Sequence, residues 1–128
     1  MKLSVVFSVQ AILAALFGLC FLFAPAWIMQ VYGLTADLPS VYFARLLGAA
    51  YIGIAMISWG ARLSMLGNRP LLVPAFATAN TLGAVVAIHQ GFIGLGNQLR
   101  WLNAVIFIAL AAGFVYHTFS PRFASLSR

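Results

Sequence analysis

Four long apolar runs dominate this chain of 128 residues and leave only short connections between them. The runs cover approximately residues 4–23, 41–60, 71–95 and 101–119. Each is close to the ~20 residues that a helix needs to cross about 30 Å of hydrocarbon. The runs therefore predict an all-α integral membrane protein, an antiparallel bundle of four transmembrane helices in which residues 1–128 form a single domain.

The composition supports the same conclusion, because only 6% of the residues are charged and 64% are apolar. A soluble domain carries about 25% charged residues, since its surface must face water. Seven Lys and Arg residues against one acid give a net charge of +6, which in a soluble protein would suggest nucleic-acid binding. Here six of the seven basic residues, all except Arg45, stand at the ends of apolar runs. This placement is typical of membrane topology, so we expect the lipid bilayer as a partner and no nucleic acid.

The distribution of Lys and Arg also predicts the orientation. If the N-terminus is inside, five basic residues are cytoplasmic: Lys2, Arg62, Arg69, Arg122 and Arg128. Only Arg45 and Arg100 then lie toward the outside. Cytoplasmic loops carry the excess of Lys and Arg, so both termini are predicted to be cytoplasmic. The first run is longer than the 7–15 apolar residues of a signal peptide, and we expect it to be retained.

The connection at residues 24–40 contains the segment PAWIMQVYG. Pro25 suits the first turn of a helix and Gly33 suits its end, while Trp27 and Tyr32 are ring types that lie at the level of lipid headgroups. A short interfacial helix is therefore predicted between the first and second spanning helices. The connection GLGNQ is barely a turn, so the third and fourth spanning helices should be antiparallel neighbours.

Small residues indicate how the helices pack, since helices in lipid associate where small side chains permit close contact. A stripe at spacings of three and four runs along the third span: Ala77, Asn80, Ala84, Ala87, Gly91 and Gly94. We expect this stripe to face a partner helix, and Gly48 to permit close approach on the second span. Asn80 is expected to hydrogen-bond across the interface in a structural role rather than to contact a substrate.

Six polar residues fall at or near the outer face in this topology: Asp37, Arg45, His89, Gln90, Arg100 and Asn103. Ionisable groups in a membrane are costly and usually have partners. Asp37 is the only carboxylate, so we expect Arg45 to pair with Asp37 or with loop carbonyls and to hold the first connection on the bundle. The alternative is an outward-facing anion or headgroup site formed by Arg45, Arg100 and Asn103.

Residues for catalysis are scarce. The chain has no glutamate, which excludes catalysis by paired glutamate and aspartate side chains. Cys20 is the only cysteine, so neither an intramolecular disulfide nor a thiolate metal cluster is possible. His117 is expected near the cytoplasmic face, about a membrane thickness from His89, so the two cannot share a haem or a metal. His89 is interpreted as a structural or interfacial histidine. We predict no catalytic residue, no metal site and no cofactor, which argues against enzymatic activity of this chain alone.

The segments FAPAWIMQVYGL and ARLLGAAYIGIAMISWGAR resemble the corresponding part of short four-helix bacterial membrane proteins of the DoxX-like group. The resemblance covers about a third of the chain, and Arg45 and Gly48 align with recognisable features of the group. It implies the same four-helix bundle and a bacterial inner membrane. Some members are membrane subunits linked to quinone-coupled sulfur oxidation, and no catalytic residue is carried over from them.

Three functional hypotheses follow. The first is a non-enzymatic accessory or assembly subunit of a larger membrane complex or homo-oligomer. The second is a small transport or lipid-binding protein that uses the polar layer around Arg45, which a cavity reaching Asn80 would favour. The third is a quinone-interacting redox subunit, which an aromatic-lined slot beside His89 or Tyr51 would favour.

Overall fold

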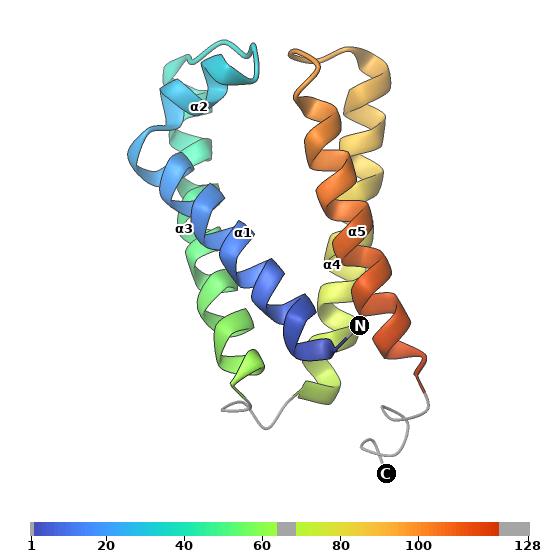
Figure 1. Ribbon diagram of the computed structural model, residues 1–128. Helices are drawn as coiled ribbons and strands as arrows, with labels where there is room; N and C mark the ends of the chain where they lie inside the picture. The colour runs from blue at the N-terminus through green and yellow to red at the C-terminus, as the bar shows by residue number, and fades with distance from the viewer. Residues whose placement is uncertain (1, 64–68, 121–128) are drawn as a thin grey trace.

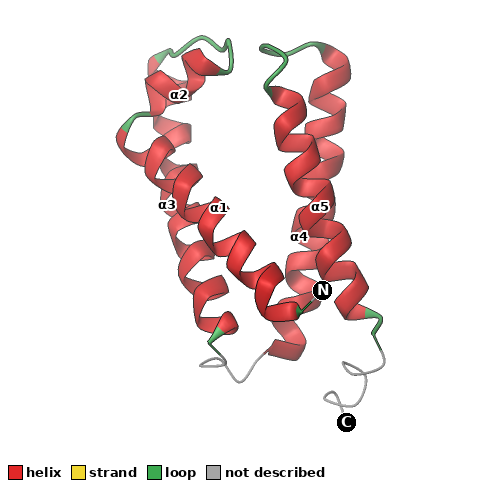
Figure 2. Ribbon diagram, viewed as in Figure 1, coloured by secondary structure: helices red, strands yellow, loops and turns green. Residues whose placement is uncertain are grey.

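The computed structural model describes residues 2–63 and 69–120, and within these ranges the chain forms helices and no strands (Figures 1 and 2). The helices are α1 (Leu3–Phe23), α2 (Pro25–Val31), α3 (Leu38–Arg62), α4 (Arg69–Ile93) and α5 (Arg100–Thr118). Four of them, all except α2, are long and apolar enough to cross a membrane. The predicted all-α bundle with a short helix after the first span is thus confirmed, and the chain fits a multi-pass membrane protein.

Local residues determine where the helices around the first connection begin and end. Pro25 occupies the first turn of α2, where its missing N–H has no partner to lose. Gly33, just after α2, has a φ of 70° that glycine adopts without strain. The α3 helix begins after Asp37, whose side chain accepts a hydrogen bond from the Ser40 backbone N–H at 2.9 Å. The carboxylate is therefore used as a helix cap.

The bundle consists of two helix pairs. The α1 helix packs along α3, and α4 packs along α5. Figure 1 shows the α1–α3 pair, with α2, on one side and the α4–α5 pair on the other; the pairs lean apart toward the end that carries α2. The turn between α4 and α5 lies at that same end, opposite the start of α1 and the end of α5. This arrangement leaves space between the pairs to be filled by side chains.

The α1–α3 pair is held at a close backbone crossing between Gly18 and Gly48. A Cβ atom added to Gly48 would lie 2.7 Å from the backbone nitrogen of Leu22 and 2.9 Å from the carbonyl oxygen of Gly18. No side chain fits in that space. The absence of side chains lets the two backbones touch, which is how helices gain van der Waals contact in lipid.

The α4–α5 pair places aromatic rings against glycines. A Cβ atom on Gly83 would lie 2.6 Å from Cδ1 of Phe107, and one on Gly91 would lie 2.7 Å from the Trp101 ring. Antiparallel packing of these neighbours agrees with the short turn between them. Of the small stripe, four members are buried and Ala87 is half-buried: Ala77, Asn80, Ala84 and Gly91.

Gly94 does not belong to that stripe, contrary to the sequence prediction. The α4 helix ends at Ile93, and Gly94 has a φ of 81° with nothing within 4 Å of an added Cβ. Its left-handed conformation terminates the helix and starts the turn.

An aromatic cluster, formed by Phe7, Phe76 and Phe114, joins the two pairs at the end that carries the start of α1. The ring centroids are 5.3 to 6.1 Å apart, and Phe7 meets the other two edge to face. Phe7 and Phe114 are completely buried. Since these rings come from α1, α4 and α5, their contact closes this end of the bundle.

Candidate functional site

A crevice lies between the two helix pairs, farther from the start of α1 than the aromatic cluster. Its volume is about 140 Å³. It begins at Gln10 and extends along α1 as far as Phe21, roughly 16 Å at 1.5 Å per residue. The lining residues are Gln10, Leu13, Ala14, Phe17, Phe21, Leu47, Tyr51, Asn80, Asn103, Ile106, Phe107 and Leu110. Leu47 at the edge is 46% exposed, so the crevice is reached from the surrounding lipid.

Two buried amides form one end of the crevice. The Asn80 Nδ2 donates to Gln10 Oε1 at 3.2 Å and to the Phe76 carbonyl at 2.8 Å. Asn80 is therefore a structural link between α1 and α4. The Gln10 amide nitrogen and Asn80 Oδ1 make no hydrogen bond to any other described residue. One donor and one acceptor thus remain for a ligand at this end.

Aromatic rings form the wall that α1 and α3 contribute. Phe17 and Phe21 are one helical turn apart and stack at 6.3 Å between centroids. Tyr51 of α3 lies 6.4 Å from both rings and nearly parallel to Phe21, at 13°. Ile106, Phe107 and Leu110 of α5 face the same crevice. The space between is suited to a flat apolar group.

The opposite end of the crevice is closed by hydrogen bonds that join the end of α2 to the α4–α5 turn and to the start of α5. We call this the interloop contact, and its residues are Val31, Tyr32, Asn97 and Asn103. The Tyr32 hydroxyl donates to Asn103 Oδ1 at 2.8 Å, and Asn97 Nδ2 donates to the Val31 carbonyl at 2.7 Å. The Asn97 backbone N–H donates to the Tyr32 carbonyl at 2.8 Å. Burial raises the pKa of the Tyr32 phenol, although the Asn103 hydrogen bond opposes the rise. Tyr32 is therefore protonated at neutral pH and can donate.

Gly96 permits this contact. Its φ is 72°, and an added Cβ would lie 2.5 Å from the Tyr32 carbonyl oxygen. Both the backbone conformation and the space require glycine.

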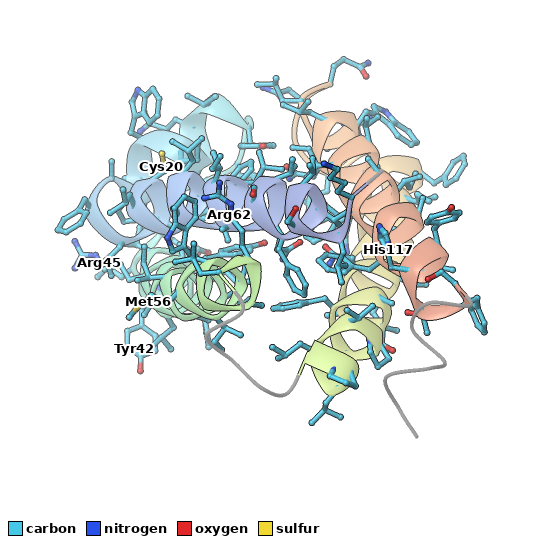
Figure 3. All side chains as sticks on the ribbon, turned by 60° about the horizontal axis from the view of Figure 1, so that its bottom comes forward. Cys20, Tyr42, Arg45, Met56, Arg62 and His117 are labelled. Atoms are coloured by element: carbon cyan, nitrogen blue, oxygen red, sulfur yellow. The ribbon has the colours of Figure 1, made fainter. Side chains whose placement is uncertain are left out.

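The structure divides the six residues of the predicted polar layer. Gln90, Arg100 and Asn103 line one groove between α4 and α5, and Asn103 also lines the crevice. Arg45 and His89 are exposed and contribute to neither. Figure 3 shows Arg45 pointing away from α4 and α5, on the same side of α3 as Tyr42.

The expected pairing of Arg45 with Asp37 or loop carbonyls is wrong: within residues 2–63 and 69–120, neither an ion pair nor a hydrogen bond involves the Arg45 side chain. Asp37 bonds the Ser40 N–H instead, and eight residues of helix place Arg45 about 12 Å farther along α3. Arg45 therefore does not hold the first connection on the bundle.

The crevice can bind, but its lining contains no acid, histidine or cysteine. Within the described ranges, no group of three such side chains is placed to hold a metal ion. Apolar and aromatic walls with a few polar groups are typical of small-molecule sites. A cavity of about 150 Å³ is known to hold a benzene ring, so the crevice has the size of one ring.

Sequence reasoning identified Asn80 and Asn103 but missed their partners Gln10 and Tyr32. Each pair joins residues about 70 positions apart in the sequence. The only available signal for Gln10 was an amide inside an otherwise apolar run.

No family model, curated protein or solved structure matches this chain. The resemblance to the DoxX-like group stays a prediction.

Proposed function

We propose that this protein binds a lipid-soluble molecule in the crevice between its two helix pairs. The observation that carries the proposal is an aromatic-lined space, open to lipid, with unused hydrogen-bonding groups along it. Sequence reasoning favoured an accessory subunit. A crevice that reaches Asn80 beside Tyr51 supports the ligand-binding alternatives instead.

The polar groups indicate the class of ligand. The Gln10 amide nitrogen and Asn80 Oδ1 are available at one end, and the Asn103 Nδ2 is available toward the other. Between them, Phe17, Phe21 and Tyr51 offer ring faces. A flat ring with carbonyl or hydroxyl oxygens on both sides satisfies these groups. A quinone ring belongs to this class, and the resemblance to DoxX-like proteins makes it the first ligand to test.

The test is titration of the full chain in mild detergent with decylubiquinone, followed by microscale thermophoresis. Tyr51→Leu removes one of the ring faces that line the crevice. We expect it to weaken binding by about 2- to 12-fold, the equivalent of one aromatic contact. Tyr42→Leu is the matched control, because Tyr42 lies on the same helix and is 60% exposed outside the crevice.

The control variant should bind decylubiquinone as the unmodified protein does. Failure of the unmodified protein to bind decylubiquinone and its reduced form contradicts the quinone assignment. Equal losses in both tyrosine variants contradict the crevice as the place of binding.

A second candidate function, a subunit of a homo-oligomer, is favoured by an apolar groove on the outer face of the α1–α3 pair. The groove has a volume of about 530 Å³ and is lined by Ala11, Ile12, Ala15, Ile52, Ala55, Met56, Trp59 and Gly60. Its small residues would let a helix of a second copy approach closely. Native mass spectrometry should then give a dimer that Ala15→Leu disrupts and that Ala50→Leu, outside the groove, preserves. A monomer without any partner contradicts this candidate.

We propose that the protein lies in the bacterial inner membrane with both termini in the cytoplasm. The excess of Lys and Arg at the ends of the chain and in the α3–α4 connection supports this orientation. Arg122 and Arg128 lie outside the described residues. Green fluorescent protein fused to the C-terminus should fluoresce, and alkaline phosphatase fused there should be inactive. The reverse pattern contradicts the orientation.

A further inference from the structure

A second concave surface lies between α4 and α5 and has a different character from the crevice. This α4–α5 groove has a volume of about 390 Å³. It is lined by Leu82, Gly83, Val86, Ala87, Gln90, Arg100, Asn103 and Phe107. Its polar members gather near the α4–α5 turn, whereas the rest, toward the middle of α4, are apolar. The groove is thus polar at the membrane edge and apolar at depth.

Arg100 supplies a positive charge at the polar end. One of its terminal nitrogens donates to the Gly96 carbonyl at 2.9 Å and to the Asn97 carbonyl at 3.3 Å, which fixes the guanidinium at the mouth of the groove. Its Nε is buried and has no hydrogen-bond partner among the described residues. The second terminal nitrogen is not buried and makes no hydrogen bond to a described residue, so it is the donor that an anion can reach.

The chain itself does not supply that anion. Asp37 is the only acid in the sequence, and its carboxylate bonds Ser40 at the start of α3. No described residue forms an ion pair with Arg100. The counter-charge therefore has to come from the surroundings.

The apolar part of the groove has the shape of a chain-binding surface. From Gln90 to Leu82 the groove follows α4 for about 12 Å. The Phe107 ring occupies the space beside Gly83, since a Cβ added there would lie 2.6 Å from Cδ1 of Phe107. The ring therefore forms the floor of the groove between Leu82 and Val86. Both of these side chains are about 60% exposed and border the groove. An acyl chain could lie along this floor while its headgroup meets Arg100.

We propose that the α4–α5 groove binds an anionic phospholipid, with the phosphate at Arg100 and Gln90 and one acyl chain over the Phe107 ring between Leu82 and Val86. The occupant is drawn from the leaflet on the side of α2. The groove shares Asn103 and Phe107 with the crevice, but Gln90, Arg100 and Val86 line only the groove. Variants of these three residues therefore test this proposal independently of the proposed function.

The test is native mass spectrometry of the full chain in mild detergent, titrated with phosphatidylglycerol or with phosphatidylcholine of the same acyl chains. The unmodified protein should retain phosphatidylglycerol more strongly. Arg100→Gln should weaken phosphatidylglycerol binding by about tenfold and leave phosphatidylcholine unchanged, because a charge-assisted hydrogen bond is lost. Arg45→Gln is the matched control, since it removes an equal charge that lies outside the groove.

A second pair of variants tests the apolar part without changing any charge. Val86 and Val85 are both 59% exposed, but only Val86 lines the groove. Val86→Trp should fill the groove and weaken phosphatidylglycerol binding, while Val85→Trp should not. This pair keeps the test decisive if Arg100→Gln fails to fold.

Three results would overturn the proposal. Equal retention of the two lipids by the unmodified protein removes the headgroup preference. If Arg100→Gln and Arg45→Gln weaken phosphatidylglycerol binding equally, the preference comes from the net charge of the protein and not from the groove. If inorganic phosphate protects against thermal unfolding as strongly as phosphatidylglycerol, no acyl chain is needed for binding.

Discussion

The close crossing of α1 and α3 leads to a sharp prediction for Gly48→Ala. The added Cβ would meet three backbone atoms of α1 at 2.7 to 3.0 Å, whereas ordinary contact begins at 3.4 Å. Backbone cannot rotate away as a side chain can, so α1 has to retreat by about 0.7 Å. A gap of this size forfeits about a quarter to a half of each dispersion contact along the crossing. Overpacking of this kind costs about 1–3 kcal/mol.

Gly53→Ala is the matched control, because Gly53 lies in the same helix and an added Cβ meets nothing within 4 Å. Both variants gain the helix propensity of alanine over glycine, about 1 kcal/mol, so their difference isolates the steric cost. We expect Gly48→Ala to be less stable than Gly53→Ala by about 1–3 kcal/mol. Gly18→Ala should fall between them, since its nearest contact is the mobile Cδ1 of Ile52 at 2.8 Å.

The assay is unfolding by titration of sodium dodecyl sulfate into mild-detergent micelles, followed by far-ultraviolet circular dichroism. Each variant is compared at the same protein and detergent concentration. If Gly48→Ala unfolds at the same point as Gly53→Ala, or later, the close crossing does not exist and the packing argument for α1 and α3 fails.

Three further predictions use the same assay. Asn80→Leu and Gln10→Leu should each reduce the free energy of unfolding by about 0.6–2 kcal/mol. The double variant should lose less than the sum of the two, because the side chains share one hydrogen bond. Full additivity would contradict the pairing. Phe7→Ala, in the aromatic cluster, should cost about 3–5 kcal/mol, while Phe43→Ala, which is 66% exposed, should have little effect. The hydrogen bonds from Ser40 lower the pKa of Asp37, so its contribution to stability is present above the unfolded pKa of about 3.9 and is lost as the pH falls through the lower folded value. Asp37→Ala should abolish this part of the loss of stability at acid pH. If the variant and the unmodified protein show the same dependence of unfolding on pH, the cap does not contribute.

The sequence alone determined the features that depend on neighbouring residues. The length of each apolar run corresponds to a spanning helix because hydrocarbon thickness sets the number of residues required. Pro25 and Gly33 bracket α2 because one has a fixed φ and the other tolerates a positive φ. The short turn made α4 and α5 neighbours because a few residues cannot reach farther. None of these conclusions needs knowledge of which helix lies opposite.

Only the tertiary structure decided how the two helix pairs meet. The sequence could place Asn80 at mid-membrane, but not beside Gln10, and it could place Arg45 and Arg100 at one depth, but not on different surfaces. Depth follows from position along a helix, whereas lateral neighbours follow from the fit of side chains on separate helices. In lipid no hydrophobic force selects between faces that are equally apolar, so van der Waals fit and a few hydrogen bonds choose. That choice formed the crevice beside Tyr51, placed Arg45 and Arg100 on different surfaces, and left Arg100 at the head of a groove.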